Sequence, residues 1–164
     1  MEYNNNEIRR QDRLLSNEEA MSLLRMGEYG VLSMVDNCND KETAYGVPVS
    51  FVWNGKDALY IHCAPEGRKL RCLDKNTNVS FCIVGKTKVI PDKFTTAYQS
   101  IVLECQAEMG LAEEERKKAL LLILEKYSPD YVEIGKKYAE RSFGRTNVIK
   151  LNIMRWSGKC KHIN

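Results

Sequence analysis

The sequence predicts a mainly β protein, a small antiparallel barrel with short helices at its ends. Six β-like runs follow one another, and turns or short helical segments join most of them. A doubly wound parallel sheet needs crossover helices between its strands, which this order does not supply. The chain has 164 residues, 43% of them hydrophobic, which suits one domain with a buried core.

The chain opens with a polar segment that leads into a short helix. We expect residues 1–13 to form a flexible lead in front of a single domain at 14–164. Ser16 and Glu19 have the spacing of a capping box. The sequence therefore predicts a helix from about Asn17 to Met26.

Three strands and a second short helix are expected next. The predicted strands span 29–35, 44–53 and 58–63, and the predicted helix spans 67–76. Pro48 lies inside the second strand. Because proline cannot donate a hydrogen bond to a neighbouring strand, Pro48 indicates a sheet edge, a bulge or a position facing a ligand.

The second half of the chain predicts two more strands, two helices and a last strand. These elements are a buried strand at 79–84, a loop at 85–97, a strand at 98–109, helices at 112–127 and 129–140, and a strand at 148–154. A connection as long as 85–97 is often functional in a compact domain, and we expect it to be a loop able to gate a site.

The composition argues against several classes of protein. A net charge of +3 is too small to indicate nucleic acid or an anionic membrane as a partner. The longest aliphatic run, 119–124, is far shorter than the roughly 20 residues of a membrane span. The six cysteines form no Cys-x-x-Cys pair, so we expect buried free thiols in a reducing cytoplasm and no metal site.

Common catalytic motifs are missing from the sequence. Gly85-Lys86-Thr87 resembles the end of a Walker A loop, but Ser80 stands where that motif needs glycine. The Gly-x-Gly-x-x-Gly, Gly-x-Ser-x-Gly and His-Glu-x-x-His patterns are also absent. No cluster of acidic, basic or nucleophilic side chains stands out in the sequence.

A cationic turn is the most informative segment of the chain. The strand predicted at 58–63 runs into a Pro/Gly turn, and the following helix begins with Arg68 and Lys69. Free backbone N–H groups gather at a helix N-terminus and, together with two cations, suit a phosphate. An ordinary loop with two solvated cations is the alternative interpretation.

Two further residues have both a structural and a functional interpretation. His62 ends the strand before the cationic turn, where it is either a structural hydrogen bonder or a donor to a phosphate or a ring carbonyl. Trp156 lies among donors near the chain end, where it either caps the barrel or stacks on a planar heterocycle.

Four blocks of sequence carry a resemblance to a known family. They are Tyr45-Gly46-Val47-Pro48-Val49-Ser50-Phe51, Leu59-Tyr60-Ile61-His62 through Gly67-Arg68-Lys69, Tyr98-Gln99-Ser100-Ile101-Val102 with Ala107, and Arg155-Trp156-Ser157-Gly158-Lys159. With these blocks in this order and spacing, the chain resembles the flavin-binding split-barrel proteins related to pyridoxamine 5′-phosphate oxidase. Within them it is most similar to the nitroimidazole-resistance subgroup.

The resemblance implies a six-stranded antiparallel split barrel that works as a homodimer, with flavin at the dimer interface. FMN is the expected cofactor, and FAD is an alternative. His62 is the implied catalytic residue, beside flavin and substrate. The implied cofactor-binding residues are Val47, Pro48, Val49, Ser50, Phe51, His62, Cys63, Gly67, Arg68, Lys69, Tyr98, Gln99, Ser100, Trp156, Ser157, Gly158 and Lys159.

One departure from the family narrows the expected reaction. The Arg-x-Val-Leu-Leu-Lys phosphate clamp of the vitamin B6 oxidases has no match, and near the C-terminus only Arg155 and Lys159 remain of their basic clamp. We therefore expect a flavin-dependent reductase of small electrophiles, such as nitroimidazoles or other nitroaromatics. A non-enzymatic flavin or haem binder, with His62 or His162 on the iron, and a plain phosphate-binding interaction module are the alternatives.

Overall fold

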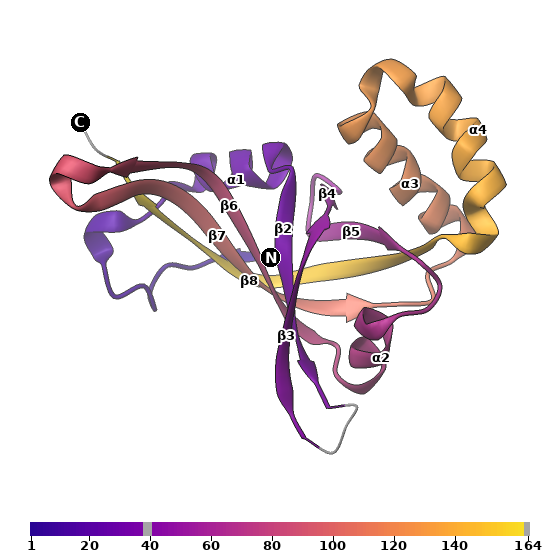
Figure 1. Cartoon of the computed structure of the whole chain (residues 1–164), viewed down its shortest axis with the longest axis horizontal. Coiled ribbons are helices and arrows are strands. Elements are labelled where there is room, and N and C mark those ends of the chain that lie inside the picture. The colour runs from indigo at the N-terminus through magenta and orange to yellow at the C-terminus, as the bar shows by residue number, and fades with distance from the viewer. Residues whose placement is uncertain (38–40, 163–164) are drawn as a thin grey trace.

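All strands of the structure, a computed structural model that describes residues 1–37 and 41–162, lie in one eight-stranded sheet (Figure 1). Their order is β3-β2-β6-β7-β8-β5-β4, and every neighbouring pair along this path is antiparallel. The strands are β1 (Glu2–Tyr3), β2 (Tyr29–Asp36), β3 (Thr43–Ser50), β4 (Val52–Trp53), β5 (Ala58–Cys63), β6 (Asn78–Ile90), β7 (Thr95–Glu108) and β8 (Asn147–Lys161).

Helices lie around the rim of this sheet. They are α1 (Asn17–Met26), α2 (Arg68–Lys75), α3 (Glu113–Tyr127) and α4 (Val132–Ser142), with short 3-10 turns η1 (Gln11–Arg13), η2 (Pro91–Lys93), η3 (Pro129–Tyr131) and η4 (Phe143–Arg145). The predicted capping box of α1 is confirmed: the Ser16 hydroxyl accepts from the Glu19 N–H, and the Glu19 carboxylate accepts from the Ser16 N–H. Within the part of the chain that the structure describes, no helix has the length and apolar character needed to cross a membrane.

The predicted fold class is confirmed, and the strand count differs for a local reason. We expected six strands, and the two additional ones, β1 and β4, have two residues each. β4 arises because the strand predicted at 44–53 breaks at Phe51. The two ends of the sheet, β3 and β4, are thus joined by a single residue, so the sheet rolls up on itself at this point.

Phe51 fixes this corner of the barrel. Its side chain is fully buried and meets the ring of Phe81 edge-on, with 5.3 Å between the ring centroids. Pro48, three residues earlier, belongs to β3, the last strand of the sheet, and is opposite Val31 of β2. Of the three alternatives for Pro48, a sheet edge, a bulge or a position facing a ligand, the structure shows the sheet edge, and an edge strand can hold a residue that lacks an N–H.

The prediction of a loop at 85–97 is wrong, because β6 and β7 continue through these residues as a long hairpin. The two strands pair from Asn78 opposite Gln106 to Ile90 opposite Thr95, with an irregularity between Val84 and Thr87. The alternation of Thr87 and Val89 with lysines is a strand pattern, which the number of lysines obscured. We call residues 86–97 the arm; it extends away from the barrel in Figure 1.

The polar lead is docked onto the barrel instead of extending freely from it. β1 pairs in parallel with β8, and the Tyr3 ring lies 4.6 Å from the Trp156 ring between centroids. The Tyr3 hydroxyl donates to the Leu15 carbonyl at 2.5 Å. An aromatic residue at position 3 therefore anchors a segment whose composition is otherwise polar.

Candidate functional site

The cationic turn lies where β5 passes into α2. Gly67 occupies the position before the helix with a φ of +152°, a backbone conformation that residues with a side chain rarely adopt. His62 and Cys63 end β5 on the approach to the turn, paired with Val148 and Asn147 of β8. The glycine thus shapes the turn, and the strand end directs it toward the helix.

Arg68 is partly engaged within the chain. Its Nε donates to the carboxylate of Asp36 at 2.6 Å, and its guanidinium lies 4.0 Å from the centre of the Tyr45 ring. The hydrogen bond to Asp36 raises the pKa of Arg68, so the guanidinium stays charged. About half of the Arg68 side chain is exposed, whereas Asp36 is buried. The pair fixes the position of the cation and leaves its outer face open to solvent.

Lys69 is the second cation of the turn. It has no hydrogen bond or ion pair with any residue that the structure describes. Burial raises the pKa of the nearby Cys63 thiol, and Lys69 offsets part of this effect. His62 is exposed at the strand end. Lys69 is therefore a second cation of the turn that is available to an anion.

β3 leads from the cationic turn to the opposite end of the barrel. Its residues alternate: Val47 and Val49 pack against the core, while Pro48 and Ser50 are exposed. Tyr45, under the guanidinium of Arg68, lies near the start of the strand. Tyr45 shares the core-facing side of β3 with Val47 and Val49, whereas Ser50 is on the exposed side. β3 thus runs from the cations at one end to Ser50 at the other, with Tyr45 and Ser50 on opposite faces.

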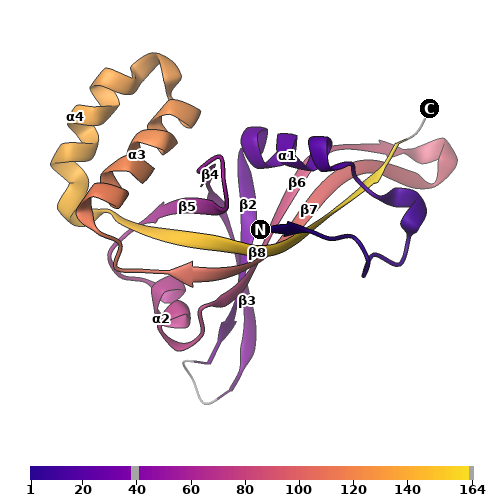
Figure 2. The ribbon, with the colours of Figure 1, turned by 180° about the vertical axis from the view of Figure 1, so that it is seen from behind.

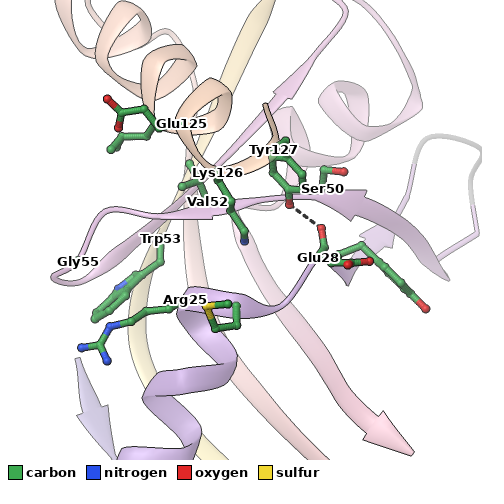
Figure 3. Close-up of a pocket in the computed structure, with 12 residues that line it drawn as sticks. Arg25, Glu28, Ser50, Val52, Trp53, Gly55, Glu125, Lys126 and Tyr127 are labelled. Carbon is green, nitrogen blue, oxygen red and sulfur yellow. Dashed lines mark hydrogen bonds between the residues drawn. The ribbon is translucent and has the colours of Figure 1, made fainter. Parts of the chain in front are cut away.

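A cleft of about 920 Å³ opens at the Ser50 end of β3 (Figure 3). It lies between the end of α1, the β3–β4 corner and the end of α3. Its polar and aromatic lining includes Arg25, Glu28, Ser50, Trp53, Lys126 and Tyr127. Figure 3 shows Lys126 extending from α3 toward the centre of this group, while the carboxylate of Glu125 turns away from it.

The last residues of α3 hold the peptide groups of Phe51. The Tyr127 hydroxyl accepts from the Phe51 N–H at 2.9 Å and lies 2.5 and 2.8 Å from the carbonyl oxygens of Glu28 and Phe51. Lys126 Nζ donates to the Phe51 carbonyl at 2.8 Å and lies 3.8 Å from the centre of its ring. Burial raises the pKa of Tyr127 and lowers the pKa of Lys126 to about 8.

Trp53 forms another wall of the cleft. The guanidinium of Arg25 lies 5.4 Å from the centre of a Trp53 ring, and the indole N–H of Trp53 is buried without a hydrogen-bond partner. Glu28 and Glu125 stand on the exposed rim. The cleft therefore offers cations and aromatic faces, which suit a planar molecule with a negatively charged or electron-rich group.

The other predicted cofactor residues lie together on β7 and β8. Ser100 stands opposite Lys159 in the ladder between these strands, and Val102 stands opposite Ser157. Tyr98 and Gln99 precede them at the base of the arm. This second group is separate from the first: in Figures 1 and 2 it lies toward the arm, while α2 lies at the far end of the barrel.

Two members of this second group have clear roles in packing. Trp156 is only 2% exposed and is covered by Tyr3, so its ring is not open for stacking within one chain, and its indole N–H lacks a partner. A side chain on Gly158 would place its Cβ 2.6 Å from the Tyr3 hydroxyl and 2.9 Å from Leu15 Cβ. The docked lead thus accounts for both residues.

Sequence reasoning missed the cleft and its cations. Lys126 lies in the last turn of the helix predicted at 112–127, where no motif singles it out, and the strand predicted at 44–53, which contains Trp53, is expected to continue unbroken. No pattern in the sequence places Lys126 beside Phe51, 75 positions away. The Lys-Tyr pair at a helix end, next to an otherwise apolar stretch, is the one available signal.

Metal ligands and thiols do not converge on either group. Among the residues described, no three His, Cys, Asp or Glu side chains are placed to hold a metal ion. The cysteines are free, with Cys72, Cys105 and Cys160 buried and Cys63 and Cys82 half-buried; Cys38 lies outside the described residues. The two candidate haem ligands are also apart, since His62 ends β5 and His162 follows β8 near Glu19.

An antiparallel barrel rolled up at one residue, with a cationic turn at one end of its edge strand, defines a split-barrel protein. The family described as pyridoxamine 5′-phosphate oxidase matches residues 16–160, which is most of the chain. The chain belongs to this family. None of the curated proteins matches it in sequence.

Solved structures share the fold at low sequence identity. A proposed 5-nitroimidazole antibiotic resistance protein from Bacteroides thetaiotaomicron is 22% identical, with a TM-score of 0.70 over 90% of this chain and 86% of that one. A FAD and haem binding protein from Mycobacterium smegmatis is 18% identical, with a TM-score of 0.73 over 92% and 74%. A haem storage protein from Vibrio cholerae is 14% identical, with a TM-score of 0.65 over 87% and 94%.

Proposed function

We propose that the chain binds a flavin, FMN in the first instance, and uses it to reduce small electrophilic molecules such as nitroaromatics. The observation that carries this proposal is the course of β3. The strand joins a turn with two cations, Arg68 and Lys69, to a cleft lined by aromatic and cationic side chains. From Tyr45 to Ser50 an extended strand covers about 17 Å. This length suits an elongated ligand with a phosphate at one end and a planar ring at the other.

The residues at the turn suit the phosphate end of such a ligand. Lys69 has no partner within the described chain, and the exposed face of Arg68 lies beside it in sequence. Gly67 brings the chain into the helix without a side chain that would keep an anion away from the backbone. Family membership supports a flavin over other phosphates, as does the FAD-binding neighbour. FAD remains an alternative to FMN.

The residues of the cleft would bind and orient the substrate. A bound flavin supplies the electron or hydride transfer itself. Lys126 Nζ, with a pKa of about 8, carries a proton into the cleft at neutral pH and can stabilise negative charge that develops on the substrate. Trp53 and Tyr127 provide apolar surface that excludes water. His62, exposed at the end of β5, is proposed to orient substrate or to donate a proton.

The absorbance spectrum of the purified protein tests the proposal, together with the mass of any cofactor released on denaturation. We expect the bands of oxidised flavin and a released FMN or FAD. A protein without visible bands that is unchanged by added flavin contradicts the proposal. That result would favour a module whose cationic turn binds some other phosphate.

Haem binding is the second candidate, and the neighbour from Vibrio cholerae favours it. His62 and His162 lie on different elements, so one chain would supply one of them at a time. Adding haem to the protein and to a His62→Ala variant separates the candidates. A Soret band that depends on His62, in a protein without flavin, would support a haem carrier or sensor.

A further inference from the structure

The amine of Lys126 lies in the cleft without a counter-ion. It forms no ion pair with any residue that the structure describes. Its Nζ donates to the Phe51 carbonyl at 2.8 Å, and it lies 3.8 Å from the centre of the Phe51 ring and 5.2 Å from that of Tyr127. A lysine among aromatic rings and a neutral carbonyl lacks the carboxylate that normally accompanies a buried ammonium.

Two other lysines of the described chain show the opposite arrangement. Lys117, on the same helix, lies 2.5 Å from Glu113, and Lys150 lies 2.9 Å from Glu115. Hydrogen bonds to these carboxylates raise the pKa of both lysines, whereas burial lowers that of Lys126 to about 8. At about pH 7.5 roughly a quarter of the Lys126 amines are then uncharged, against about one in a thousand for a lysine of ordinary pKa.

The titratable groups around the cleft leave burial as the cause of this state. They are Arg25 from α1, Glu28 just before β2, Tyr29 from β2, and Glu125 and Tyr127 from α3. The two carboxylates stand on the exposed rim, and Figure 3 shows that of Glu125 turned away from the amine. The Tyr127 hydroxyl is engaged with backbone groups of Phe51 and Glu28.

An uncharged amine in such a place is a nucleophile. Only the uncharged form has the lone pair that attacks a carbonyl carbon, and desolvation in an apolar pocket is one way in which proteins activate a lysine. The uncharged amine can donate one N–H to the Phe51 carbonyl and still present its lone pair to the cleft. Val52 and Leu122 add apolar surface to the lining, which limits access of the water that would hydrolyse a product.

The walls of the cleft define the kind of molecule that would meet this amine. Its volume of about 920 Å³ suits a small molecule, and the rings of Trp53 and Tyr127 suit a planar one. Arg25 is exposed, lies with its guanidinium 5.4 Å from the centre of a Trp53 ring, and has no hydrogen bond or ion pair with the residues described. In the view of Figure 3, Arg25 and Trp53 lie on one side of Lys126 and Tyr127 on the other. An anionic group on the ligand would pair with Arg25.

We propose that Lys126 is a covalent binding site for aromatic aldehydes that carry an anionic group. Its Nζ attacks the carbonyl carbon, the two protons of the uncharged amine leave with the carbonyl oxygen as water, and a C=N bond remains. This condensation is reversible and consumes neither electrons nor a co-reactant. Arg25 binds the anionic group, and Trp53 packs against the ring. Because imine formation needs no flavin, the inference does not depend on the proposed function.

Reductive trapping tests the site on the unmodified protein. The protein is incubated with 4-formylbenzoate and cyanoborohydride at about pH 7.5, which converts an imine into a stable amine, and labelled lysines are located by peptide mass spectrometry. We expect about tenfold or more label at Lys126 relative to Lys117 and Lys150. The ratio should fall toward about pH 10.5, where the other lysines also lose protons. Equal labelling of the three lysines at the lower pH overturns the inference.

Two pairs of variants test the roles of the amine and of the guanidinium. Lys126→Arg keeps the charge and a donor for Phe51 but forms no imine, so it should abolish the uptake of label that saturates at low aldehyde concentration, whereas Lys118→Arg should not. Arg25→Gln should reduce labelling by 4-formylbenzoate more than labelling by benzaldehyde, whereas Arg141→Gln, at an exposed position of α4, should change neither. Saturable labelling that survives Lys126→Arg contradicts the site, and equal effects of Arg25→Gln on both aldehydes contradict its preference for an anion.

The absorbance spectrum of the same samples reports flavin separately. Label at Lys126 in a protein that neither contains nor takes up flavin contradicts the proposed function alone. A flavin-loaded protein in which Lys126 is labelled no more than Lys117 contradicts the covalent site alone.

Discussion

The ammonium of Lys126 lies 2.8 Å from the carbonyl oxygen of Phe51, the single residue between β3 and β4. At this corner the chain leaves one end of the sheet for the other, so the peptide groups of Phe51 have no strand partner. Helix α3 supplies the missing partners through Lys126 and Tyr127. The residues that close the barrel are therefore the same ones that line the cleft.

Replacing Tyr127 with phenylalanine should destabilise the barrel. The change removes the acceptor of the Phe51 N–H and leaves this group, at a buried residue, without a hydrogen bond. An unsatisfied buried group costs about 1–3 kcal/mol, which urea unfolding can measure. Tyr138→Phe, at a tyrosine that is 72% exposed, is the matched control and should leave the midpoint unchanged. Equal midpoints for both variants would show that Tyr127 does not hold the corner.

Lys126 should make stability depend on pH in the alkaline range. Its pKa is about 8 in the folded chain and about 10.5 when unfolded. Between these values the unfolded chain holds one more proton, so folding stability rises with pH. The melting temperature of the unmodified protein should therefore rise by a few degrees relative to Lys126→Met from about pH 8 to 10 and stay at a constant offset below. Lys118→Met, at an exposed lysine of the same helix, should show no such trend.

Gly158→Ala should detach the N-terminal lead. The added Cβ would lie 2.6 Å from the Tyr3 hydroxyl and 2.9 Å from Leu15 Cβ, and overpacking of this kind costs about 1–3 kcal/mol. We expect faster hydrogen exchange at residues 2–15 and a lower unfolding midpoint. Gly144→Ala is the control, because its Cβ would meet no atom within 4 Å. Unchanged exchange in the lead of Gly158→Ala would contradict the packing described for Tyr3.

Lys69→Glu should weaken the binding of the ligand's phosphate without affecting the binding of its ring. Loss of one charged contact is expected to weaken FMN binding by about tenfold or more, while riboflavin, which lacks the phosphate, should bind the variant as it binds the unmodified protein. Fluorescence titration of both ligands measures this difference. Lys75→Glu, at the exposed end of α2, is the charge-matched control. An equal loss for both ligands would place the phosphate elsewhere.

The sequence by itself determined the elements whose causes are local. The capping box of Ser16 and Glu19 begins α1, Pro48 marks an edge strand, and a glycine at position 67 shapes the cationic turn. The family, too, was recognisable from four short blocks, and its match covers most of the chain. Hydrogen-bonding capacity and φ preference are properties of each residue type, so the residue and its neighbours in the sequence are enough to predict these elements.

Tertiary structure alone decided the features that join distant segments. Residues 86–97 form the arm instead of a loop because β6 and β7 pair as far as Ile90 opposite Thr95, resuming at Thr87 after the irregularity that follows Val84. Tyr3 docks the lead because Gly158, on β8, leaves room for it, and Lys126 enters the cleft because Phe51 breaks the strand. Phe51 and Lys126 are 75 positions apart in the chain, and Tyr3 and Gly158 are still further apart. The burial of these side chains, and the lowered pKa of Lys126 that burial causes, therefore follow only from the folded barrel.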